Sequence, residues 1–568
     1  MKYLLLILAT VAWIASGCSN LHPKRSSTAN ASVPLNHSSP SEATESESDS
    51  LREQRAEALA RFATGVSYEL SDKSELAIQE FYKAALADPA NEALALDLAI
   101  RFLKTKEPDK AIELLSKTAS LPQASGKVFS LLAQAYISTG ETNRAITASR
   151  SAIRKEPSSI FGYQVLADIF LKQGKADEVI KLLGSASRQT NDDALFLVGL
   201  GELHAKLFRT QPKEADAVKS GGLEALNRAS NLKPTNPNVR QKLADVYNQL
   251  GDSKSASELY LELLEEFRDL PLMRDTLRGK LANIYLQGRD KRKAAEQLEE
   301  IVRENPTRYP EAWYYLGAFA ADAKDWEKAA EYYNRALVVN PEMEQAYYDL
   351  AGVQLSRNQA GEALKTLEKA RAKFSDSFTV EFFTGLAFAQ MKSYPEAVRH
   401  FSASELIGNS TETNRLNHLF YFQLGTAFER NKDYAQAEKY FEMSLKLSPD
   451  FAEALNYLGF MWADLGVNLE KARGLLEKAV KLEPKNAAFV DSLGWVLFKL
   501  NQPESALENL LKAAELSEEP DASIYDHIGD VYQSLKQTEK AIAAWRKSLS
   551  LEPNEVIEKK LKATSSPL

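Results

Sequence analysis

A 34-residue period runs through the chain from about residue 51 to residue 553 and constrains its fold more than any other feature. Fourteen units align when they start at residues 58, 92, 126, 160, 194, 237, 275, 310, 344, 378, 418, 452, 487 and 522. The eighth residue of all fourteen units is Gly or Ala, and the twentieth residue is Ala in twelve of them. A fixed period of this length indicates a repeat architecture in which each unit is one small structural motif.

Each unit predicts a pair of antiparallel α-helices. A small residue at position eight lets the first helix lie close to the second, where position twenty faces it. Proline cannot continue a helix, because it has no N–H to donate and clashes with the preceding turn. It ends the second helix of eight units, at Pro89, Pro157, Pro234, Pro306, Pro341, Pro449, Pro484 and Pro553. One pair cannot bury its apolar face alone, so we expect successive pairs to stack.

The sequence of residues 312–317, Ala-Trp-Tyr-Tyr-Leu-Gly, and the period itself resemble the tetratricopeptide repeat. The resemblance covers residues 51–553 and implies an all-α, right-handed superhelical solenoid of about fourteen helix pairs that binds protein partners. Residues 554–568 follow the last unit and carry a charged stretch from Glu555 to Lys562. We expect this stretch to be a polar capping helix over the last apolar face.

Three places depart from the period. About nine extra residues lie around 208–222, about six around 408–417, and one around 466–468. Insertions in repeat arrays map to loops between helices. Such loops either contact partners or are tolerated without a role, and the sequence leaves both readings open.

Residues 1–17 have the layout of a signal peptide, with Lys2 before an apolar run from Tyr3 to about Ile14. The run is shorter than the roughly 20 residues that span a bilayer, and small residues precede Cys18, the single cysteine. This arrangement resembles a bacterial lipobox, which implies that Cys18 is acylated as the first mature residue. The alternative is an ordinary secretory signal with an accidental cysteine. Ser19 in place of Asp implies the periplasmic side of the outer membrane, whereas a Gram-positive source would place the anchor on the plasma membrane.

Residues 18–50 read as a tether between the acylated cysteine and the repeats. Ten of residues 19–50 are Ser, with Pro23, Pro34 and Pro40 among them, and few are apolar. A segment with so little to bury is expected to be disordered. A coil of this length has an end-to-end distance of roughly 30 Å.

Composition and motifs argue against several function classes. The formal net charge of -8 argues against nucleic-acid binding, which needs clustered Lys and Arg. One cysteine and six scattered histidines provide neither a disulfide nor a metal-ligand spacing. No phosphate loop, HExxH motif or nucleophile elbow occurs, and the adjacent Asp526 and His527 do not face each other on a helix. We therefore expect no enzymatic activity, no cofactor and no metal.

Positions two, five, nine and twelve of the first helices are expected to line a concave groove. The thirteen readily aligned units have no Lys or Arg at positions five or nine, which argues against a clamp for a C-terminal carboxylate. Instead, the later units predict an aromatic groove that becomes acidic toward the C-terminus, formed by Tyr314, Tyr348, Phe382, Phe422, Asn456, Phe460, Asp491, Trp495, Asp526 and Asp530. Aromatic side chains contribute much of the energy of protein interfaces. The alternative is that some of these rings pack within or between units.

The acidic end of this groove has a repeated spacing. Asp491 and Trp495 lie four residues apart, as do Asp526 and Asp530 in the next unit. Residues at this spacing share a helix face. The four side chains therefore predict one groove wall that suits a partner segment with an apolar side chain beside Lys or Arg.

A narrower resemblance covers about the last hundred residues. It is carried by residues 454–459 (Ala-Leu-Asn-Tyr-Leu-Gly), 463–464 (Ala-Asp), 491–495 (Asp-Ser-Leu-Gly-Trp) and 526–532 (Asp-His-Ile-Gly-Asp-Val-Tyr). These residues look like the C-terminal part of a family of bacterial repeat lipoproteins that includes the outer-membrane adaptor of the periplasmic carboxyl-terminal processing protease. The resemblance implies an adaptor with that protease and cell-wall hydrolases as partners. The alternative is a structural component of an envelope-assembly or exopolysaccharide-export machine.

The lipobox generates the first prediction. We expect Cys18→Ala to release the protein from the membrane fraction or to leave its signal peptide uncleaved, because the acylated residue is missing. Fractionation without detergent, together with the mass of the N-terminal peptide, measures both effects. A variant that is still processed and still sediments with membranes would show that Cys18 is not the anchor.

Overall fold

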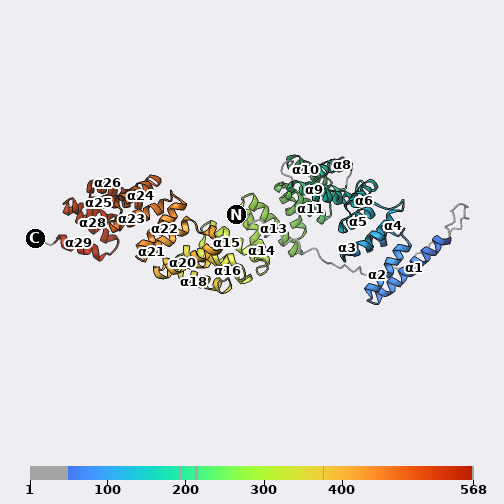
Figure 1. Cartoon of the computed structure of the whole chain (residues 1–568), viewed down its shortest axis with the longest axis horizontal. Helices are drawn as coiled ribbons and strands as arrows, with labels where there is room; N and C mark the ends of the chain where they lie inside the picture. Colours follow the sequence, from blue (N-terminus) through green and yellow to red (C-terminus); the bar gives the residue numbers. More distant parts are fainter. Residues whose placement is uncertain (1–48, 191–192, 211–214, 375–376, 566–568) are drawn as a thin grey trace. The chain divides into compact units, whose positions relative to one another are not determined.

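The computed structural model describes residues 49–190, 193–210, 215–374 and 377–565 (Figure 1). Within these residues the chain forms twenty-nine α-helices and one 3₁₀ helix, η3, and no strand. The predicted signal peptide, Cys18 and the tether as far as residue 48 lie outside the described residues. Asp49 and Ser50, which the sequence analysis assigned to the tether, are helical. None of the described helices combines the length and the apolar composition that a membrane span requires.

The chain divides into two compact units at residues 156 and 157. The described part of the first unit holds three antiparallel helix pairs. Their helices are α1 (Asp49–Leu70), α2 (Ser74–Ala87), α3 (Glu92–Lys104), α4 (Pro108–Ala119), α5 (Gly126–Ser138) and α6 (Thr142–Lys155).

The second unit holds eleven further pairs and one final helix. Its first pairs are α7 (Ile160–Lys172), α8 (Ala176–Ser187), α9 (Ala194–Thr210), α10 (Ala215–Asn231), α11 (Pro237–Gln249), α12 (Ser253–Glu266), α13 (Pro271–Gln287), α14 (Lys291–Glu304), α15 (Pro310–Asp322), α16 (Trp326–Val339), α17 (Glu344–Ser356) and α18 (Ala360–Lys373). They are followed by α19 (Phe378–Gln390), α20 (Tyr394–Thr411), η3 (Thr413–Arg415), α21 (His418–Arg430), α22 (Tyr434–Leu447), α23 (Ala452–Leu465), α24 (Leu469–Leu482), α25 (Ala487–Lys499), α26 (Pro503–Leu516), α27 (Ala522–Ser534), α28 (Thr538–Leu551) and α29 (Glu555–Ser565).

The predicted all-α fold of about fourteen helix pairs is confirmed. Twelve of the fourteen first helices begin at the residue that the repeat alignment predicted. The exceptions are α1, which begins at Asp49, and α13, which begins at Pro271. Proline is favoured at the first helical position, because its missing N–H would have no partner there and its φ already suits a helix. Pro271 therefore starts α13 four residues before the predicted position.

The two longer insertions extend helices, so the expectation that they form loops was wrong. Both α9 and α10 have 17 residues, whereas α7 and α8 have 13 and 12. Similarly, α20 has 18 residues and is followed by η3. The one-residue insertion does lie in a turn, where Gly466 and Asn468 both adopt positive φ, 69° and 49°.

A left-handed residue ends the first helix at position fifteen of thirteen units. These residues are Asp72, Lys106, Gly140, Gly174, Gly251, Arg289, Lys324, Asn358, Lys392, Lys432, Gly466, Asn501 and Lys536. Most are not glycine, although a positive φ is uncommon for other residues. In several units the next residue is an Asp whose carboxylate accepts a backbone N–H of the second helix, as Asp325 does from Lys328. This turn was not recognised from the sequence, because Lys and Arg are not typical of left-handed positions.

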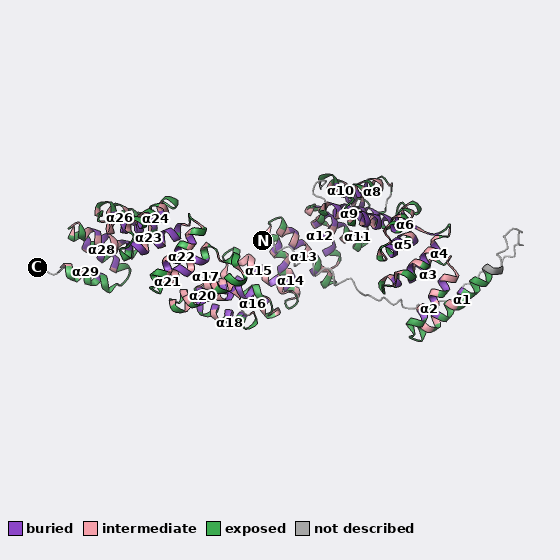
Figure 2. Cartoon of the chain, viewed as in Figure 1, coloured by how far each residue is buried: buried purple, intermediate pink, exposed green. Residues whose placement is uncertain are grey.

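Buried residues recur along the described helices (Figure 2). In the pairs with glycine at position eight, the core depends on this small residue facing a large one. A Cβ added at Gly317 would lie 2.8 Å from the ring of Tyr333, and one at Gly385 would lie 2.7 Å from the ring of Phe401. Both large residues are at position twenty-four. Position twenty also faces position eight, as the sequence predicted, and contributes mainly its backbone oxygen, at 3.2 Å in several units. Position eight is therefore small because a large side chain of the second helix lies over it.

This packing generates a prediction for Gly494. A Cβ there would lie 2.7 Å from Cγ of Leu510, so Gly494→Leu should overpack the α25–α26 contact. Overpacking typically costs about 1–3 kcal/mol of unfolding free energy. Hydrogen exchange should show the loss in the C-terminal pairs, because stability in such arrays is transmitted mainly between neighbours.

Gly474 in α24 provides the control, since a Cβ there would meet no atom within 4 Å. Gly474→Leu should leave stability unchanged or raise it by up to about 1 kcal/mol through helix propensity. Equal destabilisation by the two variants, or loosening spread evenly over all described pairs, would contradict this account of the core.

Candidate interaction surface on the first helices

The ten predicted groove residues lie at positions five and nine of the first helices from α15 to α27. We call them the A-helix row. Tyr348, Asn456, Asp491 and Trp495 are buried, and the other six members are half-buried, namely Tyr314, Phe382, Phe422, Phe460, Asp526 and Asp530. No member is fully exposed. Each side chain therefore contacts its neighbours, and a partner could reach only part of it.

The tyrosines of the row form hydrogen bonds within their own helix and with residues at or near the next unit. Tyr314 donates to Asp349 over 2.8 Å, and burial raises the pKa of both groups. The Tyr348 hydroxyl lies 2.5 Å from a carboxylate oxygen of Glu344 and 2.8 Å from Oγ of Ser377. Burial, together with the carboxylate of Glu344, raises the pKa of Tyr348 to about 12. These tyrosines thus tie adjacent helix pairs together.

The phenylalanines of the row belong to two clusters of rings. Phe382 lies 5.6 Å from the ring centre of Phe401 and 6.0 Å from that of Phe420. Phe422 lies 5.1 Å from Tyr457 and 5.2 Å from Phe451. Both rings therefore pack within and between units, which is the second of the two readings of the pattern.

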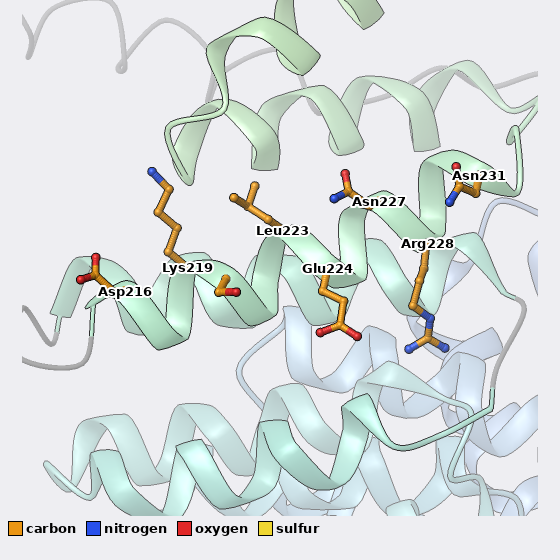
Figure 3. A pocket seen from close by; sticks show the side chains of 8 residues that line it. Asp216, Lys219, Leu223, Glu224, Asn227, Arg228 and Asn231 are labelled. Carbon is orange, nitrogen blue, oxygen red and sulfur yellow. The ribbon is translucent and has the colours of Figure 1, made fainter.

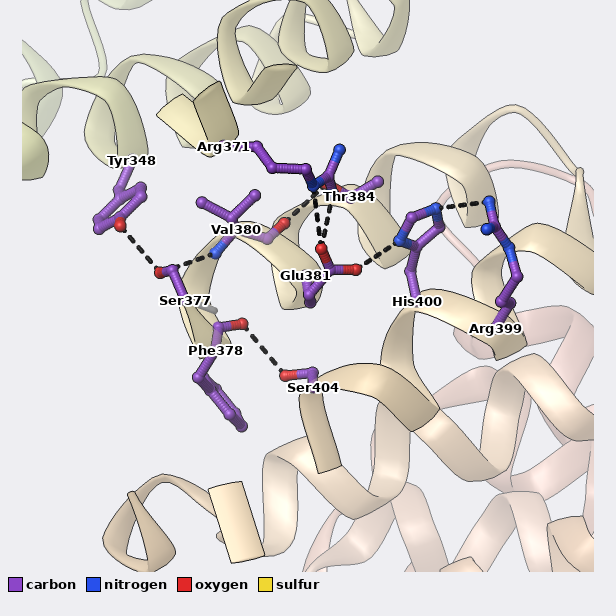
Figure 4. A network of polar contacts seen from close by, with 10 residues as sticks. All are labelled: Tyr348, Arg371, Ser377, Phe378, Val380, Glu381, Thr384, Arg399, His400 and Ser404. Carbon is purple, nitrogen blue, oxygen red and sulfur yellow. Dashed lines mark hydrogen bonds and ion pairs between the residues drawn. The ribbon is translucent and has the colours of Figure 1, made fainter. Parts of the chain in front are cut away.

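A polar network centred on Glu381 fixes the position of α19 (Figure 4). The carboxylate of Glu381 accepts from Arg371 at 2.8 Å and lies 2.6 Å from Nδ1 of His400. Burial alone would raise the pKa of Glu381, but His400 and Arg371 outweigh burial and lower it. The ring of His400 stacks on Phe388 at 5.3 Å. These contacts connect α18, α19 and α20, so we assign the network a structural role.

At the C-terminal end of the row, Trp495 stacks on His527. Their ring centres are 4.1 Å apart with an interplanar angle of 19°, and Phe460 lies 6.3 Å from the same imidazole. Nδ1 of His527 lies 2.9 Å from the carboxylate of Asp491. In the sequence, His527 stands out only as the neighbour of Asp526. Its partner is instead in the preceding unit, and the signal that could have found it is its place at position six, beside the row.

The charge of His527 follows from the carboxylates around it. Burial lowers the pKa of this imidazole, but Asp491, with smaller contributions from Asp526 and Asp530, outweighs burial. The net effect is a raised pKa. His527 therefore connects α27 to α25 through a ring contact with Trp495 and an ion pair with Asp491.

The predicted acidic wall is partly neutralised within the chain. Nζ of Lys560, on α29, lies 2.8 Å from Asp526 and 2.7 Å from Asp530. Asp530 also accepts from Nε1 of Trp545 at 3.1 Å. Burial raises the pKa of Asp530, and Lys560 only partly offsets this effect. The predicted side chains do lie on adjacent helices, but the carboxylates already have cationic partners.

Two polar atoms of the row have no such partner. Oδ1 of Asn456 and Nε1 of Trp495 are buried without a hydrogen bond to any described residue. The two residues are 8% and 7% exposed and lie on the adjacent helices α23 and α25. A buried polar atom without a partner costs free energy, commonly about 1–3 kcal/mol. Eight further buried side-chain atoms of the described residues also lack a partner, among them Nε1 of Trp462 on α23.

Two surface hollows lie away from the row. One of about 600 Å³ runs along α10 and is lined by that helix alone, including Lys219, Glu224 and Arg228 (Figure 3). The other, of about 530 Å³, is lined by residues of α16, α17 and α18, among them Gln354 and Thr366. Neither contains a member of the row. Among the described residues no group of three or more His, Cys, Asp and Glu side chains is arranged to hold a metal ion.

Comparison with protein families identifies the repeats. Models of the tetratricopeptide repeat match residues 280–346, 320–379, 418–451 and 522–555. The chain therefore contains tetratricopeptide repeats, as the period and the 312–317 sequence predicted.

The relatives are distant and cover the chain in part. Anaphase-promoting complex subunit 3 of Schizosaccharomyces pombe is 25% identical over 228 residues, which are 39% of this chain and 32% of that protein. Cellulose synthase operon protein C of Pseudomonas fluorescens is 23% identical over 176 residues, 30% of this chain and 13% of that protein. The matches thus span a third or less of the length of these relatives.

Solved structures show only a loose likeness. The Cut9–Hcn1 assembly of the anaphase-promoting complex is 18% identical, with a TM-score of 0.39 and coverage of 82% of this chain and 95% of that one. YrrB, described as a tetratricopeptide-repeat protein with an unusual peptide-binding site, is 22% identical, with a TM-score of 0.30 and coverage of 37% and 100%.

The raised pKa of His527 generates a prediction about pH. Because the imidazole binds its proton more tightly in the folded chain than in the unfolded chain, where its pKa is about 6.5, the charged form stabilises the fold. This contribution is complete below about pH 6.5 and is lost as the pH rises through the folded pKa. Hydrogen exchange of α25 and α27, corrected for intrinsic rates, should therefore quicken as the pH rises above about 6.5.

His527→Gln is the matched control, because it keeps a polar side chain but cannot carry the charge. Its exchange should show no such pH dependence in these two helices. The assignment would be wrong if the variant and the natural chain lost protection in parallel.

Proposed function

We propose that the chain is a lipid-anchored periplasmic scaffold for protein–protein interaction, with the C-terminal half of the A-helix row as its binding surface. The single observation that carries this proposal is the pair of buried, unpartnered atoms on adjacent helices, Oδ1 of Asn456 and Nε1 of Trp495. Buried polar groups in folded proteins nearly always have a partner. A ligand is a source of the missing hydrogen bonds.

An extended segment of a protein partner has the required chemistry. Its backbone N–H can donate to Oδ1 of Asn456, and its backbone carbonyl can accept from Nε1 of Trp495. The half-buried ring of Phe460 lies on the same face of α23 as Asn456, four residues further along. An apolar side chain of the partner would contact this ring.

The anchor and the adaptor role complete the proposal. Acylation of Cys18 would hold the scaffold on the periplasmic side of the outer membrane. The resemblance of the last hundred residues supports an adaptor that presents substrates to a carboxyl-terminal processing protease, with cell-wall hydrolases as those substrates.

A second candidate is a structural role in an envelope-assembly or exopolysaccharide-export machine. The observation that favours it is the similarity of 176 residues to cellulose synthase operon protein C. The two candidates differ in their partners and not in the proposed binding surface.

Crosslinking in intact cells, followed by capture and mass spectrometry, tests the surface and names the partner. Trp495→Phe keeps a ring over His527 but removes Nε1, and Asn456→Ala removes Oδ1. Each lost hydrogen bond is worth about 0.5–1.5 kcal/mol, so each variant should capture roughly twofold to tenfold less partner. Recovery of a protease or hydrolase supports the adaptor role, and recovery of synthase or porin components supports the second candidate.

Tyr434→Ala is the control, because Tyr434 is exposed at the start of a second helix, α22, outside the row. It should capture as much partner as the natural chain. Melting curves of all variants show whether they are folded. If the double variant of Asn456 and Trp495 is folded and captures normally, the row is not the binding surface.

A further inference from the structure

The last helix, α29, occupies the acidic end of the A-helix row. Its Lys560 binds the carboxylates of Asp526 and Asp530, at positions five and nine of α27. On the same helix, Ile557 is 2% exposed and packs with Trp545 of α28, and Leu561 packs against the same cluster. What α29 offers this surface is therefore one basic side chain between two aliphatic ones.

Few side chains hold α29 in place. Ile557 is the single fully buried residue among its described side chains, and Val556 is 60% exposed. By contrast, α27 and α28 bury four residues each. Elements with few buried contacts open at a lower free energy than the whole fold. We therefore expect α29 to open while α27 and α28 stay folded.

Opening of α29 would uncover a surface that fits another segment of the same kind. Asp526 and Asp530 would lose Lys560, the one lysine that binds both of them among the described residues. The neighbouring His527 could not replace it, because its Nδ1 faces Asp491. The indole of Trp545, 2% exposed while α29 is seated, would also become accessible.

We propose that α29 is a built-in occupant of the row and that a helical partner segment with Lys or Arg between two aliphatic residues displaces it. The spacing expected in the partner is that of Ile557, Lys560 and Leu561. This proposal rests on the proposed function, since it names the partner chemistry and the regulation of the same row. The proposal is supported by α29 itself, because the side chains of this helix show what the acidic end of the row accepts.

Competition by α29 has a measurable consequence. The apparent affinity of a partner falls by the fraction of chains in which the surface is open. If α29 is seated in nine chains of ten, the partner binds about tenfold more weakly than it would to an open chain. A variant that loosens α29 should therefore bind the partner segment more tightly.

A fluorescent synthetic peptide with the sequence of residues 553–566 is the probe, and the full chain is the receptor. Lys560→Glu removes the ion pairs of α29, whereas Lys559→Glu makes the same charge change at an exposed neighbouring position. We expect the peptide to bind Lys560→Glu about tenfold more tightly than the natural chain or Lys559→Glu. Adding Asp526→Asn and Asp530→Asn to Lys560→Glu should abolish this binding.

Hydrogen exchange provides the second measurement, so the result does not depend on one variant. In the natural chain α29 should exchange faster than α27 and α28, and Lys560→Glu should accelerate α29 alone. The proposal is overturned if the peptide binds Lys560→Glu no better than Lys559→Glu, or if α29 exchanges only together with α27. Dimers of the natural chain with α29 exchanged between copies would also overturn it, in favour of a second copy as occupant.

The peptide-binding and partner-capture experiments distinguish a failure of this proposal from a failure of the proposed function. Loss of partner capture by the Asn456 and Trp495 variants, with no effect of Lys560→Glu on the peptide, would leave the row as a binding surface without a displaceable helix. Tight peptide binding with normal capture by those variants would retain the displaceable helix and move the partner site elsewhere.

Discussion

The close approach of the two helices in each pair is the contact on which the rest of the structure depends. In the pairs with glycine at position eight, the helices approach because that glycine accepts a large side chain from position twenty-four, as Gly529 accepts the indole of Trp545. This contact sets which face of the first helix meets the second. The remaining faces then stack on the neighbouring pairs and present positions five and nine side by side. The A-helix row is thus a geometric consequence of a packing rule inside each pair.

A second rule concerns the polar contacts between successive pairs. A residue at position six of one first helix repeatedly binds position five or nine of the helix before it. The instances are Asp349 with Tyr314, Lys280 with Asp245, His527 with Asp491, and Lys560 with Asp526 and Asp530. Lys560 fits this rule because it is the sixth residue of α29. Through Lys560, α29 therefore makes the same kind of contact with α27 that a first helix makes with the first helix before it.

The sequence was sufficient to predict the helix pairs and insufficient to predict their polar contacts. Helix starts follow from local signals, such as small residues at a fixed period and prolines at helix ends, and Pro271 shows how such a signal can also shift a start. The contacts of Trp495 and Asp491 depend on His527, which is more than thirty residues away and lies on a different helix. The row was correctly placed on adjacent helices from spacing alone. Its neutralisation by Lys560 could not be predicted, because no rule about position six had been recognised.

According to these two rules, the side chains that are available to a partner also stabilise the contacts between units. Positions five and nine present a surface to partners, and they also receive position six of the next pair. A partner that binds the carboxylate of Asp526 or Asp530 must compete with Lys560. A partner that contacts Trp495 meets a ring that is already stacked on His527. Among the described members of the row, Oδ1 of Asn456 and the indole N–H of Trp495 are buried without a hydrogen bond to a neighbouring unit. We therefore expect partner binding to change the stability of the last helix pairs. A bound partner would replace contacts that the chain otherwise makes between its own units.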